Sequence, residues 1–197
     1  MNKPFALVLL LGLFATARPL KAQTQSSTDQ TSKFDVYGGY YYARFRVNAN
    51  VPGMAPSATY IGKGGGGQLE YNATNWLGVV GDLAGFYATS SGNSSFAGGV
   101  FTYLLGPRVN FRRGRVTPFV QAFFGGVHTT DGIEQSTGGQ DHFAMTAGGG
   151  IDFKVSRHVS VRPIQGEYFM TKIPDGLNNR QDNLRLGAGI VVRLGRE

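Results

Sequence analysis

HFAMTAGGGIDFKV, the stretch from His142 to Val155, alternates in side-chain character from one end to the other. Every second residue from Phe143 onward is apolar or glycine, whereas the residues between them are small, polar or charged. A period of two is that of a β-strand, in which successive side chains point to opposite faces. The stretch therefore predicts a strand with one apolar face and one face of small or charged residues.

The same alternation recurs along the chain, and most clearly in NLRLGAGIVVRL at residues 183–194. Counting such segments predicts eight strands, at residues 34–46, 64–72, 76–88, 97–111, 116–128, 142–155, 159–171 and 182–194. Longer connections alternate with short turns such as RRGR and SRH. This layout is typical of an antiparallel up-and-down barrel that has its long loops at one end.

The N-terminus has the features of an export signal. Lys3 precedes an apolar run from Phe5 to Ala17, which is too short to cross a bilayer as a helix. We expect a signal peptide at residues 1–22, with cleavage after Ala22 favoured over Ala17, then a flexible segment at 23–32 and the barrel at 33–197. Removing residues 1–22 takes away three cations and no acid, so the net charge falls from +7 to +4.

Either a soluble barrel with an apolar interior or a membrane barrel with an apolar exterior would alternate in this way. The expected strands are about ten residues long, as a tilted transmembrane strand requires. Aromatic residues near the ends of the apolar faces suit the interfacial girdles of a membrane barrel; they are Tyr41, Tyr71, Tyr87, Tyr103, Phe111 and Tyr168. We therefore favour an all-β, eight-stranded transmembrane barrel, with a soluble periplasmic ligand-binding barrel as the alternative.

Several segments resemble the small eight-stranded outer-membrane barrels of the OmpA-type, porin-like families. The resemblance spans Lys33 to Leu194 and is carried by FDVYGGYYYARF, NWLGVVGDLAG, LGPRVNF, VTPFVQAFFGG, GGGIDFKVSRHVSVR and LRLGAGIVVRL. It implies a monomer in the bacterial outer membrane that contacts lipid and is assembled by the barrel-insertion machinery. The chain departs from the family pattern by ending LGRE without a terminal aromatic residue, and we expect no peptidoglycan-binding domain after the barrel.

Glycines and a proline mark irregular places in the expected strands. IGKGGGGQLEYN contains a GxGxxG, but the residues after it alternate with period two and open no helix, which argues against a phosphate-binding loop. We expect Gly64, Gly66, Gly148, Gly150, Gly187 and Gly189 to face inward and make room for longer side chains, with a loop end as the alternative for Gly62 to Gly67. One extra residue at Arg162-Pro163 predicts a β-bulge.

Charged residues of both signs fall on the faces opposite the apolar rows. They are Glu70, Asp82, Arg108, Asp152, Lys154, Glu167 and Arg185. Charges in a narrow interior are costly unless they are paired. We therefore predict an ion-pair network that plugs the lumen and leaves at most slight permeability to small solutes.

The predicted function is structural or surface-interacting and non-enzymatic, with a loop partner that the sequence does not identify. The alternative is a lipid A deacylase-like enzyme, because His158 and Ser160 with Glu167 form a His-x-Ser plus Glu pattern. That pattern falls at a turn expected to face the periplasm. His128 and His142 are too few for a metal site, the dispersed cations do not suit nucleic acid, and we expect no cofactor.

Overall fold

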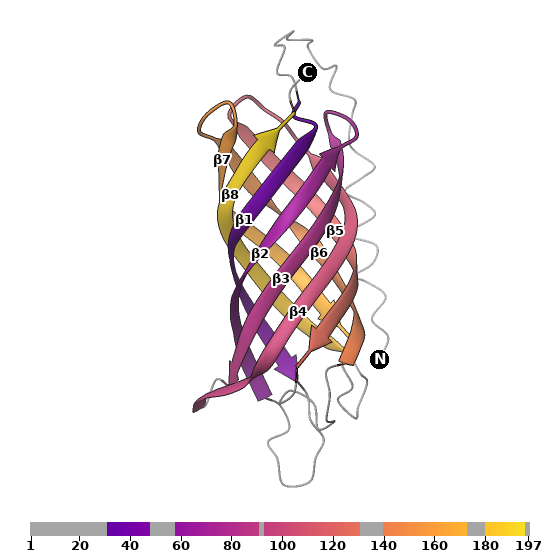
Figure 1. Cartoon of the computed structure of the whole chain (residues 1–197), viewed down its shortest axis with the longest axis vertical. Coiled ribbons are helices and arrows are strands. Elements are labelled where there is room, and N and C mark those ends of the chain that lie inside the picture. Colours follow the sequence, from indigo (N-terminus) through magenta and orange to yellow (C-terminus); the bar gives the residue numbers. More distant parts are fainter. Residues whose placement is uncertain (1–30, 48–57, 91–92, 131–139, 173–179, 196–197) are drawn as a thin grey trace, which may run out of the picture.

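The computed structural model describes residues 31–47, 58–90, 93–130, 140–172 and 180–195. They form eight strands, which are β1 (Phe34–Val47), β2 (Ala58–Asn72), β3 (Leu77–Ser90), β4 (Asn93–Asn110), β5 (Val116–Thr129), β6 (Gln140–Lys154), β7 (Val159–Thr171) and β8 (Gln181–Leu194). Each strand pairs antiparallel with the next and β1 pairs with β8, so the sheet closes into a barrel (Figure 1). The predicted fold class is confirmed. Among the described residues no helix is long and apolar enough to span a membrane.

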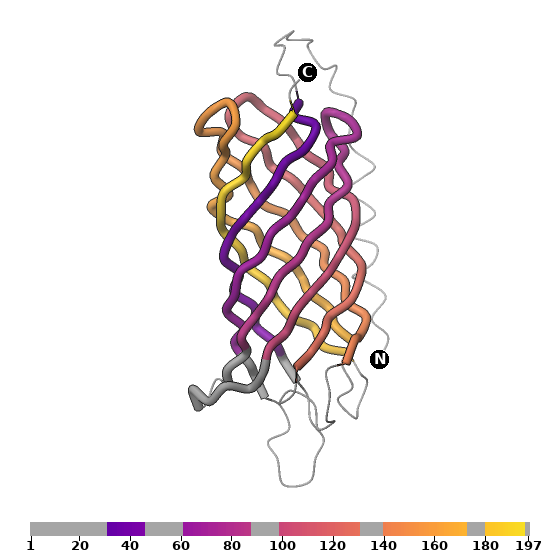
Figure 2. The backbone as a smooth tube through the Cα atoms, viewed as in Figure 1, coloured from indigo at the N-terminus to yellow at the C-terminus, as the bar shows by residue number. Residues whose placement is uncertain are grey.

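The two ends of the barrel differ in their connections. The short turns β2–β3, β4–β5 and β6–β7 lie together at the upper end of Figures 1 and 2, and we call this the turn end. The ends of the described chain also meet there, because the Lys33 amide donates to the Gly195 carbonyl at 2.8 Å. The opposite end, which we call the loop end, carries the remaining connections between strands. The residue that precedes β1 is thus hydrogen-bonded to the residue that follows β8.

The strands extend further toward the loop end than predicted. β2 begins at Ala58 instead of residue 64, and β4 begins at Asn93 instead of residue 97. Backbone pairing continues through these residues, as Val47 opposite Ala58 shows. Hydrogen bonding along a hairpin does not depend on alternating side chains, so sequence periodicity underestimates strand length where the alternation fades. All of Gly62 to Gly67 accordingly lie in a strand, and the loop-end alternative for them is wrong.

The predicted bulge is present in β7. Between Arg162 and Gln165 the strand advances three residues while β8 advances two, and a matching shift occurs against β6. The extra residue restores the phase, so that Arg162 and Gln165 are both buried inside the barrel. The ladder between β4 and β5 is interrupted at Gly106 and Pro107, the position where proline supplies no N–H group.

Side chains alternate between the lumen and the outer wall on every strand. On β8 the burial pattern switches at nearly every residue, with Asn183 and Arg185 inside and Leu184 and Ile190 outside. Tyr41 was expected in the outer girdle, but it is fully buried in the lumen. Three tyrosines follow one another at residues 40–42, so tyrosine occurs on both faces of β1 and its residue type does not indicate the side.

Four of the six glycines predicted to make room inside the barrel, Gly66, Gly150, Gly187 and Gly189, lie against aromatic rings. A Cβ on Gly64 or Gly148 would first meet the backbone of a neighbouring strand. A Cβ built on Gly66 or Gly187 would lie 2.8 or 2.6 Å from the ring of Tyr41, and one on Gly150 would lie 2.7 Å from the ring of Phe119. These distances are shorter than van der Waals contact. The missing side chains therefore make room for the rings that fill the barrel.

Candidate functional site in the barrel lumen

The structure gathers the predicted inward charges in the half of the lumen nearer the turn end. The buried ones are Glu70, Asp82, Arg108, Asp152, Glu167 and Arg185. The remaining predicted residue, Lys154, is the last residue of β6 and is only half-buried. The charges come from six strands, β2, β3, β4, β6, β7 and β8, so contacts among them link opposite walls of the barrel.

Arg185 on β8 joins two carboxylates. Its Nη1 and Nη2 donate to the two Asp82 oxygens at 2.8 and 3.2 Å, a bidentate contact that crosses the lumen. Its Nε donates to Glu167, which lies directly opposite on β7. All three side chains are fully buried, and the guanidinium also lies 4.8 Å from the centre of the Tyr41 ring. One arginine therefore supplies the counter-charge for both carboxylates.

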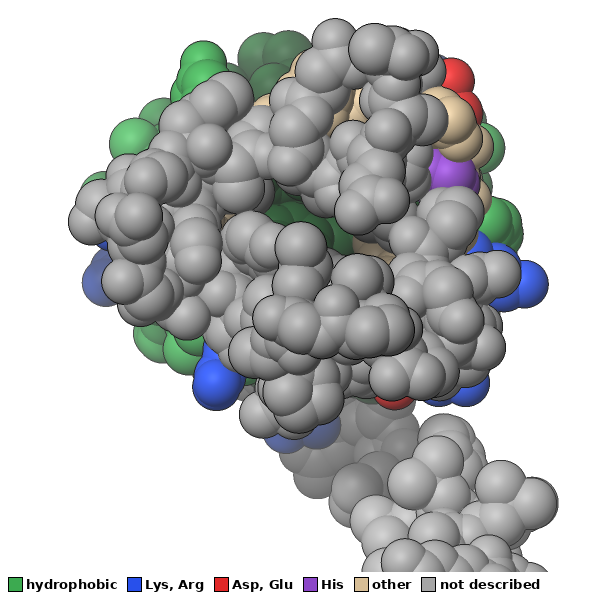
Figure 3. Space-filling view, turned by 90° about the horizontal axis from the view of Figure 1, so that it is seen from below, with side chains coloured by type: hydrophobic (Ala, Val, Ile, Leu, Met, Phe, Trp, Pro, Cys, Tyr) green, Lys and Arg blue, Asp and Glu red, His purple; other side chains and the backbone are tan. Residues whose placement is uncertain are grey.

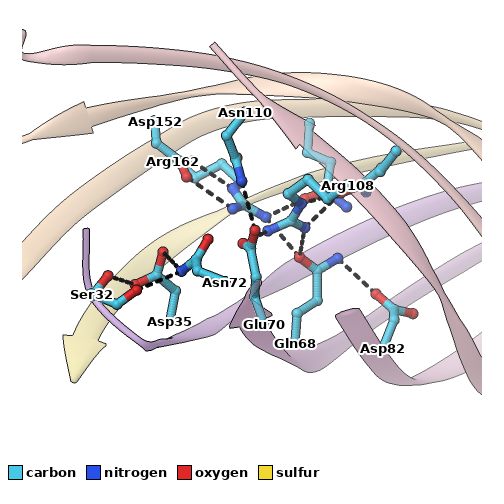
Figure 4. Close-up of polar contacts among 12 residues, drawn as sticks. Ser32, Asp35, Gln68, Glu70, Asn72, Asp82, Arg108, Asn110, Asp152 and Arg162 are labelled. Carbon is cyan, nitrogen blue, oxygen red and sulfur yellow. Dashed lines mark hydrogen bonds and ion pairs between the residues drawn. The ribbon is translucent and has the colours of Figure 1, made fainter. Parts of the chain in front are cut away.

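Arg108 on β4 is the centre of a second group (Figure 4). Its Nη1 donates to Glu70 at 2.7 Å, and its Nε donates to Gln121 at 2.8 Å. Glu70 also accepts a hydrogen bond from the Asn110 amide at 2.7 Å. Both oxygens of the Glu70 carboxylate thus have a donor.

Arg162, beside the bulge, forms a third group with Asp152 that the sequence did not predict. Two hydrogen bonds of 2.7 and 3.0 Å join the guanidinium to both Asp152 oxygens (Figure 4). The same guanidinium lies 4.3 Å from the centre of the Phe119 ring and 4.5 Å from that of Tyr37. Because it is fully buried, its charge is compensated by these contacts and not by water.

Gln68 connects the three arginine groups. Its Oε1 accepts from Arg108 and, at 2.8 Å, from Arg162, while its Nε2 donates to Asp82 at 2.8 Å. Gln121 supplies another link, because it contacts Arg108 and donates to Glu167. The turn half of the lumen is therefore one continuous polar network and not a set of separate ion pairs.

The loop half of the lumen is mainly apolar, which differs from the small or charged interior that was expected. The Phe45 ring packs edge-on against Phe86 and Phe169, each with ring centres 6.0 Å apart. Ala43, Val100, Phe123, Val127 and Ala144 are buried in the same cluster. Viewed from the loop end, hydrophobic side chains appear around the outer wall and also in the gap between the grey atoms (Figure 3).

A smaller polar group lies at the mouth of the turn end. Ser32 donates to Asp35, and the Asn72 amide donates to Asp35 at 3.2 Å (Figure 4). Arg112 donates to the Asn72 side chain at 2.6 Å and reaches Asp35 at 4.0 Å. Burial lowers the pKa of the Arg112 guanidinium, and Asp35 opposes that shift. Ser32 was expected in a flexible segment but is buried here, whereas residues 1–30, with the expected signal peptide, lie outside the described chain.

The residues of the alternative enzyme do not form a catalytic group. Glu167 is bound by Arg185 and Gln121, and His158 is exposed on the β6–β7 turn. The Ser160 hydroxyl is buried and has no hydrogen-bond partner among the described residues. A serine nucleophile needs a base within hydrogen-bonding reach and a group that orients the base, and this arrangement supplies neither.

The two histidines near the loop end also point apart. His128 lies opposite Asp141 and contacts it at 3.2 Å, whereas His142 lies opposite Val127. Successive positions face opposite sides of a sheet, so the two imidazoles cannot share a ligand. Within the described ranges no group of three or more His, Cys, Asp or Glu residues could hold a metal ion.

Comparison with known proteins agrees with this geometry. The family model described as "Outer membrane protein beta-barrel domain" matches residues 6–190. The chain belongs to this family. It is therefore an outer-membrane β-barrel. The exposed apolar side chains of its outer wall, such as Leu69, Leu83 and Leu105, form the lipid-facing belt. The search of curated proteins found no match.

Three solved structures share this fold at low sequence identity. Neisserial surface protein A matches with a TM-score of 0.61 and 17% identity, over 83% of this chain and 98% of that one. The N-terminal β-barrel domain of Pseudomonas aeruginosa OprF matches with a TM-score of 0.50 and 15% identity, over 82% and 99%. OprG from the same organism has a TM-score of 0.50 and 13% identity, over 84% and 97%.

Sequence reasoning missed several members of the network, and for different reasons. Arg162 stands beside the bulge, where the alternation changes phase, although its parity with Ser160 would have placed it inside. Gln68 and Gln121 carry no charge and were not sought. A signal was present for Gln68, which lies two positions from Glu70 on the same face of β2. For Gln121 there was none, because β5 carries no Asp, Glu, Lys or Arg.

Proposed function

We propose that this protein is a sealed, non-enzymatic outer-membrane barrel that serves as a stable support for a structural or surface-interaction role. Two different obstructions fill the lumen in series. The turn half holds a cross-linked network of three arginines and four carboxylates, and the loop half holds packed phenylalanine rings. The single observation that carries the proposal is Arg185, which is fully buried while bonded to carboxylates from two walls.

Both layers oppose permeation for physical reasons. A solute that crosses the turn half must separate hydrogen-bonded ion pairs that no bulk water replaces. A solute that crosses the loop half must displace Phe45, Phe86 and Phe169, which lie in edge contact. We therefore expect ion conductance far below that of a porin with an open aqueous channel.

Planar-bilayer recording tests this proposal. The purified, folded wild type should give no steady open-channel current, while Arg185→Ala should raise the frequency of opening. Phe124→Ala, which removes an exposed ring from the outer wall, is the matched control and should behave as the wild type does. A wild type that conducts like a wide porin would refute the sealed lumen.

Such a barrel would act through the surface that it presents outside the membrane. The Neisserial neighbour is named a surface protein, and this chain has the same fold. We propose that the connections at the loop end face the medium and contact a partner, and that the barrel acts as a monomer inserted by the barrel-assembly machinery. An epitope placed at residue 136 should bind antibody on intact cells, and one at residue 156 should bind only after permeabilisation.

The competing functions have less support. A soluble carrier would enclose an apolar cavity and expose charge, whereas here Leu69, Leu83 and Leu105 are more than half exposed on the outer wall. A lipid-modifying enzyme would need a catalytic group, and Glu167 is already engaged by Arg185. A deacylase assay on the folded barrel and on Ser160→Ala tests the enzyme directly, since activity that the variant loses would establish it.

A further inference from the structure

Exposed cations lie toward both ends of the barrel, and at the turn end three of them are arginines on two turns. Arg113, Arg115 and Arg157 are exposed on the β4–β5 and β6–β7 turns. The acids described at this end, Asp35, Glu70 and Asp152, are all buried on the lumen side. Among the described residues, therefore, no exposed carboxylate offsets these cations.

The two turns that carry the arginines are neighbours. The β4–β5 turn is closed by a pair of backbone hydrogen bonds between Arg113 and Val116, at 3.0 and 3.1 Å. The Lys154 amide, at the end of β6, donates to the Arg115 carbonyl at 2.8 Å and connects this turn to the base of the β6–β7 turn. Gly114 has φ of +60°, a conformation that glycine adopts readily. The side chains of Arg113 and Arg115 thus extend from a rigid support beside Arg157.

These cations border the lipid-facing surface. Phe111 and Phe153, the outward residues next to the two turns, are 49% and 43% exposed, and Val155 is 69% exposed. Such a ring of apolar and aromatic residues marks the boundary between hydrocarbon and headgroups. Cations immediately beyond it lie at the depth of the lipid phosphates.

The loop end has a different charge pattern. Arg180 is exposed there but is paired with Asp182 at 3.0 Å, and the exposed Asp141 lies beside His128. Cations and acids are therefore mixed at that end. Lys63 and Lys172 are also exposed toward that end, so the two ends differ in their exposed acids and not in the presence of exposed cations.

We propose that the turn end of this barrel binds anionic phospholipid headgroups through Arg113, Arg115 and Arg157. The ligand is the phosphate diester of a lipid such as phosphatidylglycerol in the leaflet that surrounds the turns. A membrane lipid fits better than a soluble polyanion, because the arginines border the outward Phe111 and Phe153, whereas the acid Asp35 is buried on the inner side of this end. The inference depends on the barrel's place in a bilayer but not on whether its lumen is sealed.

The chain contains its own reporter for this site. Trp76 is its only tryptophan, and it is 57% exposed on the neighbouring β2–β3 turn. The backbone carbonyl of Trp76 accepts a hydrogen bond from the backbone N–H of Asn110 at 2.8 Å, and the Arg112 side chain donates to the Asn75 backbone carbonyl at 3.0 Å. Lipids around the β4–β5 turn therefore come close to the indole, and their bromine atoms can quench its fluorescence.

The experiment compares quenching by brominated phosphatidylglycerol and brominated phosphatidylcholine in vesicles that contain the folded full chain. The wild type should prefer the anionic lipid several-fold. Arg113→Gln with Arg115→Gln should remove nearly all of that preference, since each basic residue near an anionic surface contributes up to roughly a factor of five. Raising the salt from 0.1 M to 1 M should reduce it too, because the screening length falls from about 10 to about 3 Å.

The control is Lys63→Gln with Lys172→Gln, which removes the same charge from exposed residues toward the loop end. This pair should keep the wild-type preference. Migration on unheated gels establishes that each variant is folded, and the single variants Arg113→Gln and Arg115→Gln replace the double variant if it does not fold. The proposal is wrong if the wild type shows no preference, if the turn and control pairs lower it equally, or if equimolar inorganic phosphate abolishes it.

Discussion

Replacing Arg185 by methionine should destabilise the barrel more than any other single change in the network. The substitution keeps most of the side-chain volume but leaves Asp82 and Glu167 buried without their cation. Charge-assisted hydrogen bonds contribute about 1.5–3 kcal/mol each, and removing one partner of a buried pair costs about 3–5 kcal/mol. Because two carboxylates lose the same partner, we expect a loss of about 4 kcal/mol or more in the free energy of unfolding.

Glu167→Gln should cost much less, although it removes a charge from the same cluster. The network of three arginines and four carboxylates has one more acid than base, so the amide removes its excess negative charge. Arg185 keeps its bidentate contact with Asp82. We expect a loss of about 1 kcal/mol, the value of one ordinary hydrogen bond. Asp82→Asn should fall between the two, and its combination with Arg185→Met should cost less than the sum by about 1–3 kcal/mol.

Urea-induced unfolding of the refolded barrel in lipid vesicles measures these differences, with folding followed by migration on unheated gels. Thr146→Val is the control, because the Thr146 hydroxyl is buried without a partner among the described residues and lies outside the ion network. Its stability should stay within about 1 kcal/mol of the wild type. The reasoning fails if Glu167→Gln costs as much as Arg185→Met, or if neither differs from the control.

Three further predictions concern the wall of the barrel. Ala147→Arg should cost about 2–4 kcal/mol because its side chain enters hydrocarbon, and Ala147→Leu should cost little; equal urea midpoints for the two would contradict a lipid-facing β6. Gly187→Val should lower the urea midpoint because its Cβ would lie 2.6 Å from the Tyr41 ring, while Gly81→Ala, with nothing within 4 Å of its Cβ, should not. Deleting Pro163 should preserve folding, because Arg162 and Gln165 then still face the lumen without the bulge. Deleting Gly166 should prevent folding, because the residues on one side of the deletion would then face the wrong side of the sheet. The opposite result on unheated gels would refute this assignment of the bulge.

The fold could be predicted from the sequence because a period of two survives in nearly every strand. The alternation in β6 and β8 alone places Ala147 and Ile190 outside and Arg185 inside. The alternation is uninformative where both faces carry the same kind of residue. For that reason Tyr41 was predicted in the outer aromatic girdle, although it is buried in the lumen. Strand ends were also missed, since backbone pairing needs no side-chain pattern.

The pairing inside the lumen was beyond the reach of periodicity. The residues that meet across the barrel, such as Asp82 and Arg185, are 103 positions apart. Which of them meet depends on the stagger between strands, and alternation does not fix that stagger. The apolar loop half was missed for a related reason, because Phe86 and Phe169 indicate a shared cluster only once their heights in the barrel are known.

The two charge patterns in this barrel are connected by where its acids lie. Asp35, Glu70, Asp82, Asp152 and Glu167 are all buried, and Arg108, Arg162 and Arg185 compensate four of them inside the lumen. Of the acids that the structure describes, only Asp141 and Asp182 are exposed, and both lie toward the loop end. At the turn end Arg113, Arg115 and Arg157 have no exposed acid beside them among the described residues, and under the proposed binding the lipid phosphates of the adjacent leaflet supply the counter-charge.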